Sequence, residues 1–266
     1  MITPRKRFGQ HFLRDKIVVA QIIDALEIQA EDSLIEIGPG DGVLTEGILP
    51  LCEHLTVIEV DWDCCAVLRK KYTDNPRFNL LEADVLTVDF TQLIHSLKQA
   101  QMRVLGNLPY NISTPLLFHL CAHRSVIADM HFMLQKEVVE RLSAPPGCKA
   151  YGRLSVMIQF YCSVTPLLEI PPQVFFPPPK VDSAFVRLVP YATSPYPDCD
   201  EKHFAEIVRL AFSHRRKTLT NCLKGVISRE QLLAAGYDPA IRAEQLAVSD
   251  FVQLATLTHG IGSKSS

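Results

Sequence analysis

Residues 33–42, SLIEIGPGDG, run from a short, mostly apolar segment directly into a turn that contains three glycines. A segment of this kind, bounded by a turn, is typical of a buried strand. Gly38, Gly40 and Gly42 let the backbone bend sharply and approach a ligand where a Cβ atom would collide. The next stretch, VLTEGIL at 43–49, predicts a helix. An ordinary glycine-rich connection between a strand and a helix is the alternative interpretation of this motif alone.

The alternation of strands and helices continues on both sides of this segment. Apolar residues at helical spacing predict helices over 16–27 and 113–123. Such an alternation indicates an α/β fold with a parallel, doubly wound, Rossmann-like sheet, and an antiparallel strand over 183–189 is expected at its edge. The other predicted strands are LTVIEV (55–60), FNLLEAD (78–84), MRVLGNLPY (102–110) and MHFMLQ (130–135).

A change in composition predicts a second domain. The stretch PYATSPYPDCD at 190–200 contains three prolines and has no apolar periodicity, which is typical of a linker. Beyond it the pattern is helical, and Ser228 with Gln231 forms a capping box ahead of an apolar pair. We therefore expect a first domain over 1–190 and a small, all-helical domain over 197–266.

Composition and charge exclude several classes of protein. The 266 residues include 27 Lys and Arg against 29 Asp and Glu, a formal net charge of −2, which argues against a histone-like nucleic-acid binder. The eight cysteines form no C-x-x-C pair and lie near no zinc-spaced histidines, so no metal is expected. No apolar run is long enough for a membrane span or a secretory signal, which predicts a soluble, cytoplasmic protein.

Carboxylates end the second and third strands of the predicted sheet. Glu59 follows Gly38 by 21 residues, the spacing of a carboxylate that accepts hydrogen bonds from ribose hydroxyls. Asp84 ends the next strand, where a carboxylate can accept from an adenine amino group. Because the carboxyl ends of parallel strands share one edge of a sheet, these groups and the glycine turn predict a nucleoside pocket. The chain has no pyrophosphate-binding glycine pattern or obvious phosphate lysine, which favours S-adenosylmethionine as the ligand.

The fourth predicted strand ends in Asn107-Leu108-Pro109-Tyr110. The exocyclic nitrogen of adenine is a poor nucleophile because its lone pair is delocalised into the ring. The Asn107 side-chain oxygen and the Leu108 carbonyl can accept its two hydrogens and so favour a pyramidal, nucleophilic nitrogen. Pro109 would fix the backbone that presents these acceptors, and Tyr110 would stack on an extruded base. An Asx-type turn with a packing tyrosine is the alternative for this tetrapeptide in isolation.

Several motifs occur in a specific order: GQHFL (9–13), EIGPGDGVLT (36–45), VIEVD (57–61), GNLPYNISTP (106–115) and FFPPPKVDSA (175–184). Together they resemble the ribosomal RNA adenine N6-dimethyltransferases, and more narrowly the bacterial small-subunit enzymes whose loss confers kasugamycin resistance. FSHRRKTL (212–219) extends the resemblance into the C-terminal domain, so that it covers roughly residues 8–225.

The resemblance implies a fold, a reaction and a set of site residues. It implies a class I methyltransferase sheet and no metal. The substrate would be two adjacent adenosines in the loop of the 3′-terminal hairpin of 16S ribosomal RNA, within the immature small subunit, and nothing demands more than a monomer. Phe175 would contact the target base opposite Tyr110. Its alternative role is an apolar plug beside the proline loop at 177–179. The residues implied to line the S-adenosylmethionine pocket are His11 (often Asn in the family), Leu13, Gly38, Gly40, Glu59, Asp84 and Asn107.

Two basic runs predict a surface for RNA. No acid lies between Glu206 and Glu230, and the positive charges in and near this interval include Arg209, Arg215, Arg216, Lys217 and Lys224. On a helix, residues 215–217 would fan over the surface, Lys224 would share the face of Lys217, and Arg209 would extend that face. Phosphate contacts of this kind position RNA without reading its sequence. A merely solvated charged face is the alternative, and the N-terminal residues add a second basic run.

Two rival functions remain at this point. A resistance methylase of large-subunit ribosomal RNA shares the N-terminal motifs. A non-catalytic assembly factor that binds the small subunit belongs to a different class, and the intact tetrapeptide at 107–110 argues against it.

Overall fold

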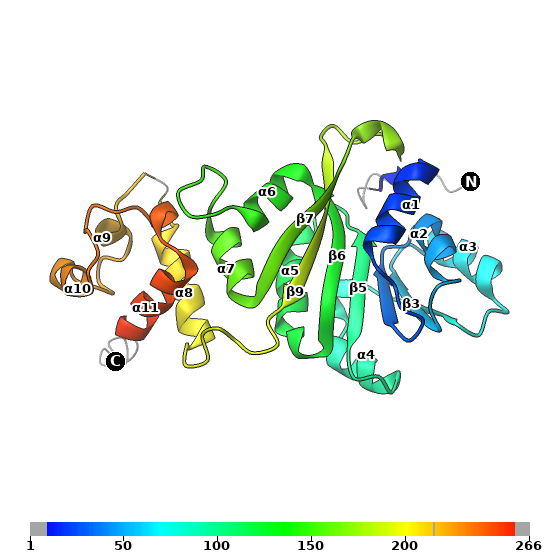
Figure 1. Ribbon diagram of the computed structural model, residues 1–266, viewed down its shortest axis with the longest axis horizontal. Coiled ribbons are helices and arrows are strands. Elements are labelled where there is room, and N and C mark those ends of the chain that lie inside the picture. The colour runs from blue at the N-terminus through cyan, green and yellow to red at the C-terminus, as the bar shows by residue number, and fades with distance from the viewer. Residues whose placement is uncertain (1–9, 215, 259–266) are drawn as a thin grey trace. The chain divides into compact units, whose positions relative to one another are not determined.

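The computed structural model describes residues 10–214 and 216–258. Its described residues form two compact units. The first comprises 10–139 and 163–190, and the second comprises 140–162 and 191–258 without residue 215. The first unit contains the sheet and the helices that cover it, and the second unit is helical (Figure 1).

The first unit is built on a seven-stranded sheet with the order β4-β3-β2-β5-β6-β9-β7. The five strands from β4 to β6 pair in parallel, and β9 pairs antiparallel with β6. This confirms the predicted Rossmann-like sheet with an antiparallel strand near its edge. The strands are β2 (Ser33–Ile37), β3 (His54–Glu59), β4 (Phe78–Glu82), β5 (Met102–Asn107), β6 (Ile127–Gln135), β7 (Cys162–Ile170) and β9 (Ser183–Pro190).

Helices cover both faces of this sheet. Ile22, Leu44 and Leu68 come from three helices and pack in one buried cluster with strand residues such as Val57 and Leu105. In Figure 1, α1 lies in front of the sheet and α5 lies behind it. The helices are α1 (Lys16–Ala25), α2 (Val43–Ile48), α3 (Trp62–Tyr72), α4 (Phe90–Ser96) and α5 (Ser113–Ala122).

A separate two-stranded ribbon joins segments that are far apart in the sequence. β1 (Phe12–Leu13) pairs antiparallel with β8 (Phe175–Phe176), so that Phe12 lies opposite Phe176 and Leu13 lies opposite Phe175. The ribbon holds the chain just before α1 against the segment that precedes the proline run.

The second unit is helical. Tyr151 Oη donates to the Leu246 carbonyl at 2.8 Å, and the rings of Phe160 and Phe204 stack with centroids 4.1 Å apart. These contacts explain why residues 140–162, which the sequence places in the first domain, belong to the compact unit of the C-terminal helices. The functional division into 1–190 and 197–266 stays a prediction. The helices that contribute to this unit are α6 (Lys136–Ser143), α7 (Arg153–Tyr161), α8 (Glu201–Ala211), α9 (Leu219–Cys222), α10 (Arg229–Ala234) and α11 (Val248–Thr258).

Two further findings concern the described residues as a whole. No helix within 10–214 or 216–258 is long and apolar enough to cross a membrane. The same part of the chain holds no group of three or more His, Cys, Asp or Glu side chains placed to bind a metal ion.

Candidate cofactor and substrate site

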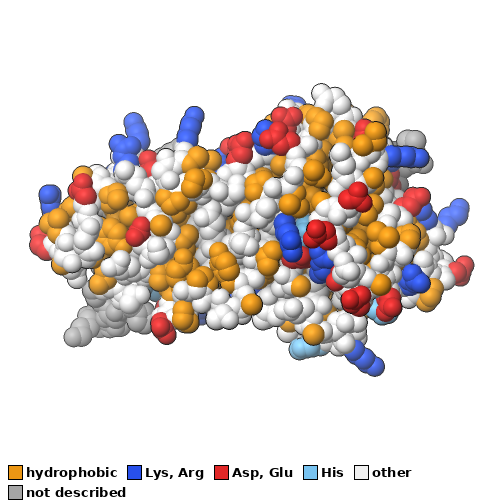
Figure 2. Space-filling view, viewed as in Figure 1, with side chains coloured by type: hydrophobic (Ala, Val, Ile, Leu, Met, Phe, Trp, Pro, Cys, Tyr) orange, Lys and Arg blue, Asp and Glu red, His pale blue; other side chains and the backbone are white. Residues whose placement is uncertain are grey.

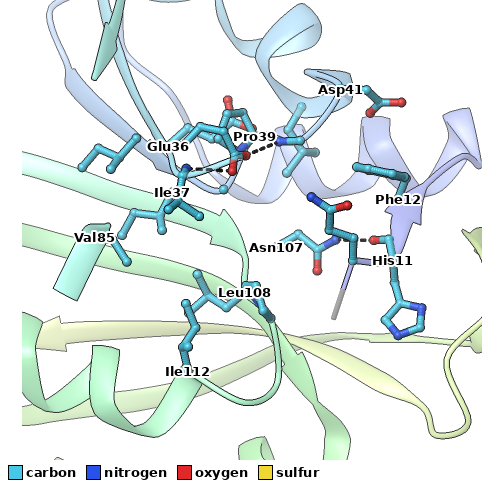
Figure 3. A pocket seen from close by; sticks show the side chains of 18 of the residues that line it. His11, Phe12, Glu36, Ile37, Pro39, Asp41, Val85, Asn107, Leu108 and Ile112 are labelled. Atoms are coloured by element: carbon cyan, nitrogen blue, oxygen red, sulfur yellow. Dashed lines mark hydrogen bonds between the residues drawn. The ribbon is translucent and has the colours of Figure 1, made fainter. Parts of the chain in front are cut away.

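A pocket lies at the carboxyl ends of β2, β3, β4 and β5, the edge at which the sequence predicts a nucleoside site (Figure 3). The residues that line it come from the N-terminal segment, the glycine turn, two strand ends and the tetrapeptide turn. They are residues 10–13, 36–41, 43, 44, 58–60, 83–85 and 107–112. All the cofactor residues predicted from the sequence are among them.

The glycine turn after β2 has a backbone that favours glycine at two pocket positions. Gly38 and Gly40 have φ angles of +65° and +60°, values that L side chains rarely adopt. A Cβ atom on Gly38 would meet only the Asn107 carbonyl, at 3.9 Å, so the turn leaves open space beside it. A Cβ atom on Gly40 would lie 2.7 Å from the ring of Phe12. The turn therefore brings bare backbone to the pocket wall.

Glu59, the last residue of β3, is buried and held by three main-chain donors. Its Oε1 accepts from Val60 N and Asp61 N, both at 2.9 Å, and its Oε2 accepts from Gly40 N at 3.1 Å. Burial raises the pKa of Glu59, and these hydrogen bonds oppose the rise. Because a carboxylate offers about four acceptor sites, one site remains, on Oε2. The orientation of this acceptor is thus fixed before a ligand arrives.

A second buried carboxylate, Glu36 of β2, also lines the pocket. Thr45 Oγ1 donates to its Oε2 at 2.6 Å. Burial raises the pKa of Glu36 to about 7, and the negative charge of Glu59 contributes to this shift. Glu36 is not among the site residues predicted from the sequence, although an acid within a buried apolar strand is a detectable signal.

Asp84 and Leu13 line the pocket in different ways. Asp84 is exposed, begins the short 3₁₀ helix η2 (Val85–Thr87), and accepts from Leu86 N through Oδ1 at 3.0 Å. Leu13 is buried in the apolar core and contributes a hydrophobic wall. Asp84 therefore offers an exposed polar acceptor to the pocket, and its contact with an adenine amino group stays a prediction.

Asn107 ends β5 and begins the tetrapeptide turn. Its side-chain Nδ2 donates to the His11 carbonyl at 2.9 Å (Figure 3). Leu108 N donates to the Met133 carbonyl at 3.2 Å, which fixes the start of the turn on the neighbouring strand. Tyr110 Oη lies 2.9 Å from Ser183 Oγ, and burial raises the pKa of this tyrosine. The turn is thus fixed by contacts with the N-terminal segment at His11, with β6 at Met133 and with β9 at Ser183.

The chain matches the family model described as ribosomal RNA adenine dimethylase over residues 1–259. The chain belongs to this family. It is 50% identical over 256 residues to Ribosomal RNA small subunit methyltransferase A of Hydrogenovibrio crunogenus, with 96% of each chain covered. It is 52% identical over 251 residues to the protein of the same name from Salmonella newport, covering 94% of this chain and 92% of the relative. The resemblance predicted from the motifs, and the enzyme class with it, are confirmed.

Two solved structures share the fold of this dimethylase. A dimethyladenosine transferase from Plasmodium falciparum has a TM-score of 0.76 and 27% identity, covering 92% of this chain and 96% of that one. The 23S rRNA methyltransferase ErmE has a TM-score of 0.72 and 23% identity, covering 93% and 99%. The second similarity shows the fold alone.

The pocket residues fit S-adenosylmethionine, the methyl donor that membership of a methyltransferase family implies. Gly38 leaves open space at the wall, Glu59 keeps one buried acceptor site, and Asp84 adds a second acceptor. Within the described residues, Asn107 Oδ1 has no hydrogen-bond partner. The pocket thus combines fixed acceptors with apolar walls, as a nucleoside requires.

The structure does not bring Phe175 to the pocket of the dimethylase. Phe175 is only 4% exposed and packs in the apolar core with Leu13 and Phe185. Its neighbour Phe176 is 53% exposed. The position of Phe175 fits the alternative interpretation, an apolar plug beside the proline loop, and gives no support to its predicted contact with the target base.

Other pocket residues escaped the sequence analysis because they act through long-range contacts. The ring of Phe12 packs against Gly40. Arg14 forms an ion pair with Asp41 at 2.5 Å, and Asp41 Oδ1 is buried without a hydrogen-bond partner among the described residues. The motif GQHFL at 9–13 is the sequence signal for this segment, because its resemblance to the family implies a place near the cofactor. It does not indicate which contacts the segment makes.

The predicted helical arrangement of the C-terminal basic residues is wrong. α8 ends at Ala211 and α9 comprises only Leu219–Cys222, so Arg216 and Lys217 lie in the turn between them. Arg209 does not extend a free basic face, because it forms an ion pair with Glu206, with contacts of 2.6 and 2.7 Å. Arg215 lies outside the described residues.

Three of the predicted RNA-binding residues are nevertheless exposed. Arg216, Lys217 and Lys224 are exposed, and none of them forms an ion pair with an acid in the described part of the chain. Figure 2 shows that Lys and Arg side chains project at several places on this face of the molecule. The role of these residues in RNA binding stays a prediction.

Proposed function

We propose that this dimethylase transfers methyl groups from S-adenosylmethionine to N6 of two adjacent adenosines in the loop of the 3′-terminal hairpin of 16S ribosomal RNA. The substrate would be the immature small subunit, and the enzyme would act in the cytoplasm as a monomer. The observation that carries the proposal is the 50–52% identity, over nearly the whole chain, to proteins named Ribosomal RNA small subunit methyltransferase A.

The residues of the pocket suit this reaction. When bound, S-adenosylmethionine supplies a methyl group on a positively charged sulfur, which is already activated for displacement. Asn107 Oδ1 and the Leu108 carbonyl would accept the two hydrogens of the adenine amino group and turn its lone pair toward the methyl group. Tyr110 would stack on the base. Glu59 and Asp84 would hold the nucleoside, and positioning would supply most of the rate acceleration.

The two predicted domains would have different functions. Residues 1–190 would bind the cofactor and the target base, and residues 197–266 would dock the RNA through exposed cations such as Arg216, Lys217 and Lys224. Phosphate contacts hold RNA without reading its sequence, so the extruded adenine would supply local recognition.

The test compares two RNA substrates with the purified full-length enzyme and radiolabelled S-adenosylmethionine. Immature small subunits from cells that lack the enzyme should take up label, whereas free large-subunit RNA should not. Mass spectrometry of the RNA should locate the label at two adjacent dimethylated adenosines near the 3′ end. Label on large-subunit RNA would indicate the rival methylase, and binding without any label would indicate a non-catalytic assembly factor.

A further inference from the structure

The hydrogen bond between Asn107 and His11 defines the orientation of the Asn107 amide. The His11 carbonyl can only accept, so the group that faces it at 2.9 Å is the Nδ2 amino group of Asn107. Oδ1 therefore points away from His11, as Figure 3 shows, and it has no hydrogen-bond partner within the described residues. This is the orientation in which Asn107 presents an acceptor.

The ring of His11 contacts the proline run at 177–179 and the tetrapeptide turn at 107–110. Its Nδ1 donates to the Pro177 carbonyl at 2.7 Å, and its ring stacks on the ring of Tyr110 with centroids 5.9 Å apart. In Figure 3 the ring points away from the glycine turn, while the main-chain carbonyl of His11 faces Asn107. His11 thus contacts Asn107 through its backbone and the proline loop through its side chain.

The segment that directly follows His11 is anchored at two residues. Phe12 pairs with Phe176 across the ribbon and packs against Gly40, and Arg14 forms an ion pair with Asp41. These contacts fix the path of the backbone that carries the His11 carbonyl. The ring contacts to Pro177 and Tyr110 remove the remaining freedom at residue 11 itself.

We propose that His11 is a positioning residue: its carbonyl selects the amide rotamer of Asn107 that presents Oδ1 to the adenine amino group, and its ring holds that carbonyl in place. The proposal rests on the proposed function. If the amide turned by 180°, its amino group would face the amino group of adenine, donor against donor. This role is separate from the prediction that His11 lines the cofactor pocket, where the structure also places it.

The test measures methyl transfer to immature small subunits by wild type, His11→Ala, His11→Asn, and the same two variants combined with Asn107→Ala. His11→Ala keeps the main-chain carbonyl but loses the ring contacts that hold it, so kcat should fall by roughly ten- to a hundredfold, less than when the Asn107 acceptor itself is removed. The dissociation constant of S-adenosylmethionine and the KM for subunits should stay within about threefold. His11→Asn keeps a side-chain N–H for the Pro177 carbonyl and should retain most of the kcat.

The combined variants separate positioning from general damage. If His11 acts through Asn107, His11→Ala should cost less than about threefold once Asn107 is already alanine, because contacting residues are not additive. The matched control is His95→Ala, an exposed histidine of α4, which should behave as wild type. Thermal unfolding of each variant tests whether the fold persists.

Three results would overturn the positioning role: a normal kcat in His11→Ala, a fully multiplicative loss in the Asn107→Ala background, or a loss confined to S-adenosylmethionine affinity. A wild-type enzyme that leaves immature small subunits unmethylated would instead overturn the proposed function. The two failures are therefore distinguishable in the same experiment.

Discussion

Glu59 Oε2 accepts a hydrogen bond from the main-chain N–H of Gly40 at 3.1 Å, which ties the end of β3 to the glycine turn that follows β2. Gly40 has a positive φ angle, and its missing Cβ leaves room for the ring of Phe12. The pocket at this edge of the sheet is therefore assembled from a carboxylate, a turn and an aromatic ring on three separate segments. Preorganisation of this kind lowers the cost of binding.

The first prediction concerns cofactor affinity. Glu59→Ala removes the one acceptor site that remains on Oε2 for a ribose hydroxyl. A hydrogen bond to a charged group contributes about 1.5–3 kcal/mol, so the dissociation constant of S-adenosylmethionine should rise by roughly ten- to a hundredfold. Calorimetric titration measures this change, with Glu53→Ala, an exposed glutamate, as the control. An unchanged affinity in Glu59→Ala would remove this residue from the binding site.

The second prediction separates catalysis from binding. Asn107→Ala should lower kcat by roughly a hundred- to a thousandfold, because its acceptor matters most as the adenine nitrogen becomes nucleophilic. The affinity for small subunits should change by less than about threefold, and some loss of cofactor affinity is expected from its place in the pocket. Single-turnover kinetics with saturating cofactor measures the chemical step. Near-normal turnover under these conditions would show that Asn107 has no part in the reaction.

The third prediction concerns the dependence of stability on pH. Burial raises the pKa of Glu36 to about 7, from 4.5. Between these values the folded protein binds more protons than the unfolded chain, so this group makes the free energy of unfolding fall as pH rises through the window. Glu36→Gln lacks this titration. Its stability relative to wild type should therefore increase by up to about 3 kcal/mol from pH 4.5 to pH 8.

Urea denaturation of the cofactor-free protein at several pH values measures this difference. Gln keeps an oxygen that can accept from Thr45 Oγ1, so the hydrogen bond at 2.6 Å need not be lost. A constant difference in stability between the two proteins across the window would show that Glu36 titrates normally.

The fourth prediction concerns the exposed cations of the second unit. Replacing Arg216, Lys217 and Lys224 by alanine should weaken binding to small subunits. It should also flatten the salt dependence of binding by about one unit of slope for each lost phosphate contact. Cofactor affinity should not change, because the lining of that pocket comes from the first unit. Titrations of small subunits at several salt concentrations measure both quantities.

The control for this variant neutralises an equal number of exposed cations in the first unit, namely Lys70, Arg77 and Lys98. Its salt dependence should stay parallel to that of wild type. If the slope of the Arg216, Lys217 and Lys224 variant also stays parallel, these charges form a solvated face and the RNA is held elsewhere.

Local sequence patterns are sufficient to predict the sheet and the edge at which its functional groups meet. Strands and helices alternate with short turns, so the pattern that decides each element is local. Glu59, Asp84 and Asn107 each end a strand, and parallel strands bring their carboxyl ends to one edge whatever the details of packing. The pocket could therefore be predicted before any contact was known.

Features that depend on pairing between distant segments could be seen only in the folded chain. The Phe12–Phe176 and Leu13–Phe175 pairs join residues more than 160 positions apart, and this register places Phe175 in the core and the His11 carbonyl on Asn107. Residues 140–162 belong to the second unit because rings such as Phe160 stack on a C-terminal helix. Local periodicity indicates which face of a helix or strand is apolar, but only the packed fold decides which surface buries that face.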